Sequence, residues 1–261
     1  MSGVMDGRRV LVAGPRNKWS LAWPAALSLR REGAQIAFSV KTEREASEFG
    51  GLLQSTGFDA PVFVCDATDD AQVEELFRQV SAVFDGKLDG LVHSIAFADA
   101  RDLAGEYVST TKEGYTLAQE SSAYTLVSLT RGARPLMQEA GGGSVVTLTY
   151  LGSERVVPNY NVMGVAKAAL EASMRYLAAD LGPENIRVNA VSAGAVKTLS
   201  ARAIKGFDSM LKQVEERAPL RRRVDPEEVG DAMLFLLSPW GRGVTGQVLY
   251  VDAGYHIVGM P

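Results

Sequence analysis

Short runs of apolar residues alternate along this chain with longer stretches in which apolar positions recur every three or four residues. The short runs predict buried strands at 8–14, 34–40, 60–66, 88–97, 143–150, 185–194 and 246–254. The longer stretches predict helices at 20–33, 69–84, 121–139, 159–182 and 225–238. Apolar strands that alternate with helices are typical of a parallel sheet covered on both faces. We therefore expect an α/β fold, a single doubly wound Rossmann-type domain over residues 1–261 with a seven-stranded parallel sheet.

Composition and charge narrow the class of protein. The chain is 46% hydrophobic with a formal net charge of −4, so it can build a large core and shows no basic excess that favours nucleic acid or an anionic membrane. Cys65 is the single cysteine beside two histidines, so we expect neither a disulfide framework nor a metal site. No apolar stretch suits a signal peptide or a membrane span, which predicts a cytoplasmic protein.

The turn after the first strand is a candidate phosphate site, because doubly wound sheets bind ligands beyond the carboxyl ends of their strands. Dinucleotide folds usually carry G-x-G-x-x-G here, but only Gly14 is present, followed by Ser20 and Ala22. Such a turn brings backbone N–H groups and a helix N-terminus to a pyrophosphate. An ordinary turn with Ser20 as helix N-cap explains the stretch equally well.

The ends of the second and third strands carry charges that have two interpretations each. No acidic residue precedes Glu43, whereas Lys41 and Arg44 would suit the 2′-phosphate of NADP or would be solvated charges at a helix start. Asp66 would accept a hydrogen bond from an adenine amino group or would cap the next helix. The residues alone leave both choices open.

The strongest chemical signal is "NYNVMGVAK", residues 159–167. Residues seven apart lie nearly one above the other on a helix, so Tyr160 and Lys167 share a face, with Gly164 between them. An interior glycine costs about 1 kcal/mol relative to alanine, so we interpret it as a gap that admits a cofactor ribose and a substrate carbonyl. A neighbouring cation would favour an ionised or polarised phenol, able to donate to that carbonyl. A core tyrosine beside a snorkelling lysine is the alternative, but it does not explain the glycine.

These residues together resemble the bacterial enoyl-acyl-carrier-protein reductases of the short-chain dehydrogenase/reductase superfamily. The common superfamily pattern, Tyr-x3-Lys, fails because Met163 stands four positions before Lys167. The reductases instead carry Tyr-x6-Lys with a second tyrosine ten residues upstream, which Tyr150, Tyr160 and Lys167 match. The likeness covers essentially the whole chain, and its other matches are Gly14, Ser20 and Ala22 in the first turn, "CDA", "HSIAFA", "RVNAVSAG", "TLSA" and "VDAGY".

The resemblance implies reduction of the C2=C3 double bond of a trans-2-enoyl-acyl-carrier-protein in fatty acid synthesis, with NADH or NADPH as hydride donor. It implies a homotetramer, a flexible substrate lid around 197–212 and three catalytic residues: Tyr150, Tyr160 and Lys167. The cofactor-binding residues that it implies are Gly14, Ser20, Leu21, Lys41, Asp66, Ala67, Ser94, Ile95, Lys167, Val196 and Thr198. The implied substrate-binding residues are Phe97, Tyr150, Tyr160, Met163, Ile204 and Phe207.

The sequence departs from the family at positions that bear on cofactor and partner. Lys41 stands where NADH-using relatives often carry glutamine, which leaves NADH and NADPH both open. The acidic carrier protein is expected to meet basic residues near the lid, with Lys205, Lys212 and the run Arg221 to Arg223 as candidates. His93 lies in a strand beside the cofactor and is not expected to take part in catalysis.

Overall fold

The computed structural model describes residues 3–196 and 207–259. Two predicted site residues, Thr198 and Ile204, therefore lie outside the described residues, as do the first ten residues of the expected lid, 197–206. Phe207 begins helix α8 (Phe207–Arg217), but its side chain is not among the described ones.

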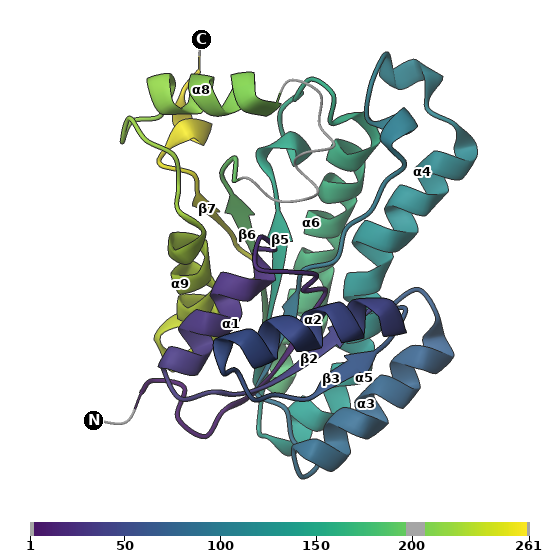
Figure 1. Cartoon of the computed structure of the whole chain (residues 1–261), viewed down its shortest axis with the longest axis vertical. Coiled ribbons are helices and arrows are strands. Elements are labelled where there is room, and N and C mark those ends of the chain that lie inside the picture. The colour runs from purple at the N-terminus through teal and green to yellow at the C-terminus, as the bar shows by residue number, and fades with distance from the viewer. Residues whose placement is uncertain (1–2, 197–206, 260–261) are drawn as a thin grey trace.

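All seven expected strands form one parallel sheet in the order β3-β2-β1-β4-β5-β6-β7 (Figure 1). The predicted Rossmann-type α/β architecture is confirmed. The strands are β1 (Arg9–Ala13), β2 (Gln35–Val40), β3 (Val62–Val64), β4 (Gly90–His93), β5 (Gly143–Thr149), β6 (Ile186–Ala193) and β7 (Val248–Val251).

Helices cover both faces of the sheet, which explains why the strands are apolar at nearly every position (Figure 1). In β1, Val10 and Val12 face one core and Leu11 and Ala13 face the other. The first core includes α1 (Ala22–Arg31), α2 (Glu43–Thr56) and α9 (Pro226–Leu237). The second includes α3 (Asp70–Val83), α5 (Thr125–Glu139) and α6 (Asn161–Leu181).

The sequence pattern missed two helices. Helix α2 is mostly exposed and buries only Phe49 and Leu53, so its apolar periodicity is weak. Helix α4 (Lys112–Gln119) runs through a π-helical turn, Glu120–Tyr124, into α5, so this helical region begins at 112 rather than at 121. π-helical turns often occur at functional sites, and Ser121 of this turn lines the cavity described below.

The carboxyl ends of β1 and β4 lie against each other at the first turn. Gly14 has φ +92°, and a Cβ there would lie 2.4 Å from the Ser94 carbonyl oxygen. The Gly14 N–H donates to Ser39 O on β2 at 2.9 Å, and the Ser94 N–H donates to Ala13 O at 2.9 Å. Only glycine fits this position, and the contact sets the first turn beside residues 94–97.

Within residues 3–196 and 207–259, no helix has the length and apolar character needed to cross a bilayer. The same residues contain no group of three or more His, Cys, Asp and Glu side chains that could hold a metal ion.

Candidate active site

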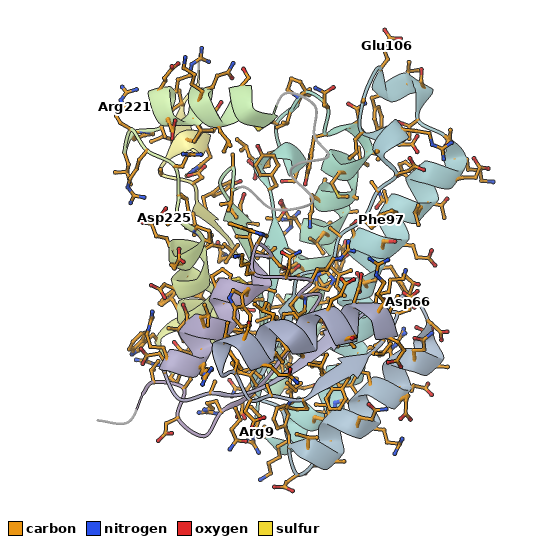
Figure 2. The ribbon with its side chains drawn as sticks, viewed as in Figure 1. Arg9, Asp66, Phe97, Glu106, Arg221 and Asp225 are labelled. Atoms are coloured by element: carbon orange, nitrogen blue, oxygen red, sulfur yellow. The ribbon has the colours of Figure 1, made fainter. Side chains whose placement is uncertain are left out.

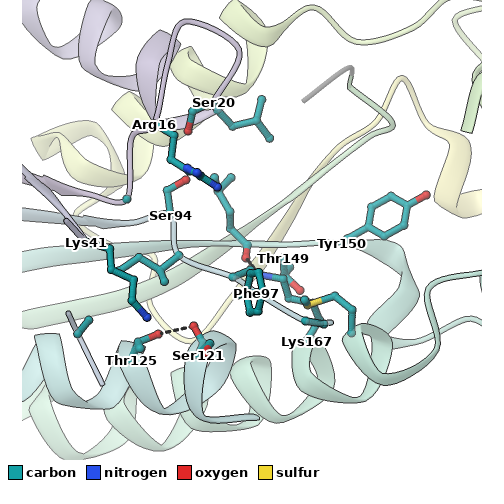
Figure 3. A pocket seen from close by; sticks show the side chains of 18 of the residues that line it. Arg16, Ser20, Lys41, Ser94, Phe97, Ser121, Thr125, Thr149, Tyr150 and Lys167 are labelled. Carbon is teal, nitrogen blue, oxygen red and sulfur yellow. Dashed lines mark hydrogen bonds between the residues drawn. The ribbon is translucent and has the colours of Figure 1, made fainter. Parts of the chain in front are cut away.

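A cavity of about 730 Å³ opens at the carboxyl edge of the sheet (Figure 3). It brings together every predicted site residue whose side chain the structure describes. The first group comes from the turn after β1 and the ends of the next strands: Gly14, Ser20, Leu21, Lys41, Asp66, Ala67, Ser94, Ile95 and Phe97. The second group comes from β5, α6 and the segment after β6: Tyr150, Tyr160, Met163, Lys167 and Val196.

The first turn leaves the N-terminus of α1 without a side-chain cap, so an anionic group can bind there. Helix α1 begins after Leu21 without a capping hydrogen bond from a side chain, so the interpretation of Ser20 as N-cap is wrong. The side chains of Ser20 and Arg16 both line the cavity instead. A glycine turn, a helix N-terminus and an arginine fit the pyrophosphate of a dinucleotide.

Two ion pairs lie where β2 and β3 end. Lys41 Nζ is 2.9 Å from Asp66 Oδ2, and Arg16 Nε is 3.1 Å from Glu45 Oε1. Burial acts to raise the pKa of Asp66, but hydrogen bonds from Lys41 and Thr68 outweigh it and lower that pKa. The sequence reasoning missed Arg16, which lies two residues after Gly14, and Glu45, which lies in the first turn of α2, a helix that the sequence pattern did not predict.

The two interpretations of Asp66 and Arg44 can now be separated. Asp69, not Asp66, caps α3, where its carboxylate accepts from Ala71 N at 2.9 Å. Asp66, labelled in Figure 2, accepts from Thr68 Oγ1 at 2.7 Å and lines the cavity. Arg44 pairs with Glu48 at 2.8 Å along the exposed side of α2, as solvated charges do.

Tyr150 and Tyr160 meet edge to face, with ring centroids 5.1 Å apart at 73°. The Tyr150 hydroxyl donates to Met210 Sδ of α8 at 3.2 Å, and burial raises its pKa to about 12. In Figure 3 this hydroxyl points away from Lys41 and Lys167. The contact joins the end of β5 to α8.

Tyr160 is a neutral phenol, contrary to the expectation that Lys167 would favour its ionised form. Burial is the largest effect and raises its pKa, and the charges of Tyr150 and Glu171 act in the same direction. Among the described residues, none accepts a hydrogen bond from the Tyr160 hydroxyl. The phenol therefore keeps its proton and is suited to donate it to a ligand oxygen.

Lys167 is held against the strand that precedes Tyr150. Its Nζ donates to Leu148 O at 2.7 Å, and the residue is only 6% exposed. Burial lowers its pKa to about 8, while the carboxylate of Glu171 acts to raise it. The amine is thus mostly cationic at neutral pH and has further N–H groups for an acceptor in the cavity.

Gly164 does not form a ligand gap, so this part of the sequence interpretation is wrong. A Cβ at Gly164 would lie 2.7 Å from the carbonyl oxygen of Gly152, in the turn Leu151–Ser153 that follows β5. The Tyr160 ring packs on the same turn, where a Cβ at Gly152 would lie 2.5 Å from it. The glycine is required because α6 approaches this turn backbone to backbone.

A buried polar chain supports the floor of the cavity. His93 Nδ1 lies 2.8 Å from Thr147 Oγ1, and Nε2 lies 2.9 Å from Thr125 Oγ1. Burial, and then the charge of Lys167, lowers the pKa of His93 to about 3, so the ring is neutral. Thr125 and Ser121 line the cavity but His93 does not, in line with a structural role.

The fold and this site together define an oxidoreductase of the short-chain dehydrogenase/reductase type that uses a nicotinamide dinucleotide. The sequence profile of the family described as "Enoyl-(Acyl carrier protein) reductase" matches residues 14–256. The chain belongs to the enoyl-acyl-carrier-protein reductase family.

Relatives of known activity resemble the chain over their full length. "Enoyl-[acyl-carrier-protein] reductase [NADH] FabI" of Bacillus subtilis is 50% identical over 260 residues, covering 98% of this chain and 99% of the relative. The enzyme of Staphylococcus aureus strain MRSA252, named as [NADPH] FabI, is 46% identical over 255 residues, 97% of this chain and 98% of its own.

Solved structures of this family have the same fold. The Bacillus cereus enoyl-acyl carrier protein reductase with NADP⁺ and an indole naphthyridinone has a TM-score of 0.95 and 47% identity, covering 99% of this chain and all of that one. The Anaplasma phagocytophilum enzyme in complex with NAD has a TM-score of 0.94 and 42% identity, covering 100% of this chain and 98% of that one.

The contact at Gly164 generates a stability prediction. We expect Gly164→Ala to lower the free energy of unfolding by up to about 2 kcal/mol, because overpacking against the Gly152 carbonyl costs about 1–3 kcal/mol and the gain in helix propensity is about 1 kcal/mol. Urea unfolding followed by circular dichroism measures the change. Gly51→Ala is the matched control, since Gly51 lies in α2, is exposed and has no atom within 4 Å of an added Cβ. The control should be stabilised, and a Gly164→Ala protein as stable as the control would contradict the packing argument.

Proposed function

We propose that this chain reduces the C2=C3 double bond of a trans-2-enoyl-acyl-carrier-protein with NADH or NADPH in fatty acid synthesis, with Tyr160 as the donor to the thioester oxygen. The observation that carries the assignment of residues is one cavity lined by both the glycine turn after β1 and the Tyr160–Lys167 pair on α6. Family membership and full-length similarity support the reaction itself.

The residues present fit a nicotinamide dinucleotide along the cavity. Gly14 packs so closely on Ser94 that a Cβ would not fit. Because no side chain is present there, a pyrophosphate can approach the backbone of the first turn. Lys41 and Asp66 flank the place for the adenosine end, and Lys167 would bind the ribose at the nicotinamide end. When bound, the reduced nicotinamide supplies a hydride to the β carbon of the enoyl group.

Tyr160 acts on the substrate rather than on the cofactor. As negative charge grows on the thioester oxygen, the neutral phenol donates a hydrogen bond to it, and stabilisation of such charge is often the largest catalytic effect. Protonation at the α carbon completes the reduction. The acyl chain would lie against Phe97, Met163 and Tyr150, with Leu103 and Leu117 as further apolar lining.

Residues 1–261 are proposed to act as one dinucleotide-binding and catalytic domain, because both halves of the sheet contribute to the cavity. Helix α8 is the described part of the proposed lid around 197–212, and its Met210 contacts Tyr150. A reducing, cytoplasmic setting is also proposed. It fits Cys65, a free and buried thiol whose pKa is raised to about 12, first by burial and then by Asp66 and Asp69.

The proposed partner is an acyl carrier protein, but not all of the expected basic residues are available to it. Arg222 pairs with Glu228 at 2.7 Å and Arg223 with Glu215 at 2.6 Å, while Arg221 donates to the Glu216 carbonyl. Arg221 also lies on the opposite side of the molecule from Phe97 (Figure 2). Lys212 has only a loose pair with Glu216 at 3.9 Å, so it is the better candidate among the described residues.

The reaction is tested by following cofactor absorbance with crotonyl-CoA and either NADH or NADPH. We expect Tyr160→Phe to retain cofactor affinity but to reduce the thioester at least about a hundredfold more slowly, because the donor to the developing charge is lost. Tyr150→Phe is the comparison, and its loss should be smaller because that hydroxyl is bonded to Met210. Equal turnover of Tyr160→Phe and wild type would remove Tyr160 from the mechanism. No oxidation of either cofactor by the wild type would refute the proposed reaction.

Cofactor choice is proposed to depend on Lys41. We expect Lys41→Ala to lower kcat/KM for NADPH about tenfold and to leave that for NADH within about twofold, because only the former needs a cation for its 2′-phosphate. Arg44→Ala is the matched control, since Arg44 lies on the same segment but pairs with Glu48 in solvent. If the two variants change the NADPH-to-NADH ratio equally, Lys41 has no specific role.

A homotetramer is proposed because large apolar side chains are exposed near the C-terminal end and on α6. Ile257 is 68% exposed, Tyr176 76% and Trp240 59%. Light scattering should give four times the mass of one chain, and Ile257→Asp should weaken assembly by placing a charge in an apolar contact. Val83→Asp, at the end of α3, is the control and should leave the mass unchanged. A wild-type protein that is only monomeric would refute the tetramer.

A further inference from the structure

Glu171 is a buried carboxylate that the proposed reaction does not use. It lies on α6 one turn beyond Lys167 and is 5% exposed. Thr149 Oγ1, at the end of β5, donates to Glu171 Oε1 at 2.5 Å. A buried carboxylate is costly unless it is well compensated, so a residue of this kind calls for a physical reason.

The hydrogen bond to Thr149 forms half of a clamp between α6 and β5. Lys167 Nζ donates to Leu148 O at 2.7 Å, and Glu171 accepts from the next residue of the same strand. Two successive residues of β5 are thus held by two side chains of α6 one helical turn apart. Tyr150 is the next residue along the chain. The clamp therefore fixes the end of β5, which carries both Tyr150 and the carbonyl that Lys167 contacts.

Several titratable groups lie around this clamp. Glu171 raises the pKa values of Lys167, Tyr160 and Tyr250, and the effect on Lys167 opposes that of burial. The other titratable groups that face this region are Tyr150 after β5, Glu154 after the turn Leu151–Ser153, His93 on β4, and Tyr250 and Asp252 at the end of β7.

We infer that Glu171 is a positioning residue for the nicotinamide-ribose lysine: with Thr149 it clamps α6 to the end of β5, and its negative charge keeps Lys167 in the ammonium form. This inference rests on the proposed function of Lys167. The alternative is a purely structural carboxylate that holds the helix on the strand and has no effect on the charge of the amine.

The two alternatives differ in how cofactor binding depends on pH. Lys167 binds an acceptor more strongly as an ammonium group than as a neutral amine, so affinity should fall as pH rises through its pKa of about 8. Glu171→Gln keeps an oxygen that accepts from Thr149 but removes the charge. Since the charge raises the pKa, its removal should move the alkaline fall in affinity to lower pH, by about one pH unit. A structural role would weaken binding by the same factor at every pH.

The test measures the dissociation constants of NADH and NADPH by fluorescence across pH 6 to about 10, together with competitive acetylation of Lys167 followed by mass spectrometry. E171Q should shift the midpoint of both curves downward. Thr149→Val should weaken binding without this shift, because it leaves the carboxylate in place. Asp231→Asn is the control for loss of a hydrogen-bonded carboxylate elsewhere. Asp231 lies on α9 and accepts a hydrogen bond from Ser28 at 2.7 Å. The midpoint of this variant should equal that of the wild type.

Glu171→Asp covers the case in which E171Q does not fold. It keeps the charge on a shorter side chain, so we expect a smaller shift in the same direction. An unshifted midpoint in folded E171Q, or in E171D if only that variant folds, would overturn the inference even if the wild type reduces crotonyl-CoA. A wild type that does not reduce crotonyl-CoA would instead refute the proposed function. Binding and acetylation would still report whether Glu171 controls the charge of Lys167.

Discussion

The close backbone contact between α6 and the turn after β5 is the constraint on which the site depends. Gly164 lies against the Gly152 carbonyl with no space for a side chain, and the Tyr160 ring covers the same turn. At this separation Tyr160 also meets Tyr150 edge to face, and Lys167 reaches the carbonyl of Leu148. A wider separation would move the phenol and the amine away from the strand end together. The glycine therefore sets the position of the helix and does not leave space for a ligand.

Burial then decides the protonation states of the two groups that this contact brings in. Burial raises the pKa of Tyr160 and lowers that of Lys167 to about 8. The phenol is therefore neutral, and the amine beside it is protonated at neutral pH by a narrow margin. A cation close enough to ionise the phenol would remove the proton through which Tyr160 is proposed to donate a hydrogen bond to the thioester oxygen. The low dielectric of the site strengthens the hydrogen bond that the neutral phenol donates. The carboxylate of Glu171, one helical turn beyond the lysine, acts against burial and favours the ammonium form.

The sequence was sufficient for the sheet because all seven strands are short apolar runs buried on two faces, a pattern that needs no tertiary information. The spacing of Tyr150, Tyr160 and Lys167 likewise predicted that the three residues share a site, and the structure brings all three to one cavity. The environment of Gly164 was not predictable, since its neighbour belongs to a turn twelve residues earlier. Helix α4 was missed because few of its residues are buried and because a π-helical turn shifts its face relative to α5.

The paired charges at the ends of β2 and β3 explain how one scaffold can serve two cofactors. A 2′-phosphate that attracts Lys41 must draw it from Asp66, 2.9 Å away, and the lysine side chain is 60% exposed, so both the pair and its replacement are screened by water. Exchanging one screened partner for another changes the free energy little. Arg16 forms a similar ion pair with Glu45. Relatives that are 50% and 46% identical to this chain are named as NADH and NADPH enzymes, respectively, so the family contains both cofactor types at similar distance from this sequence.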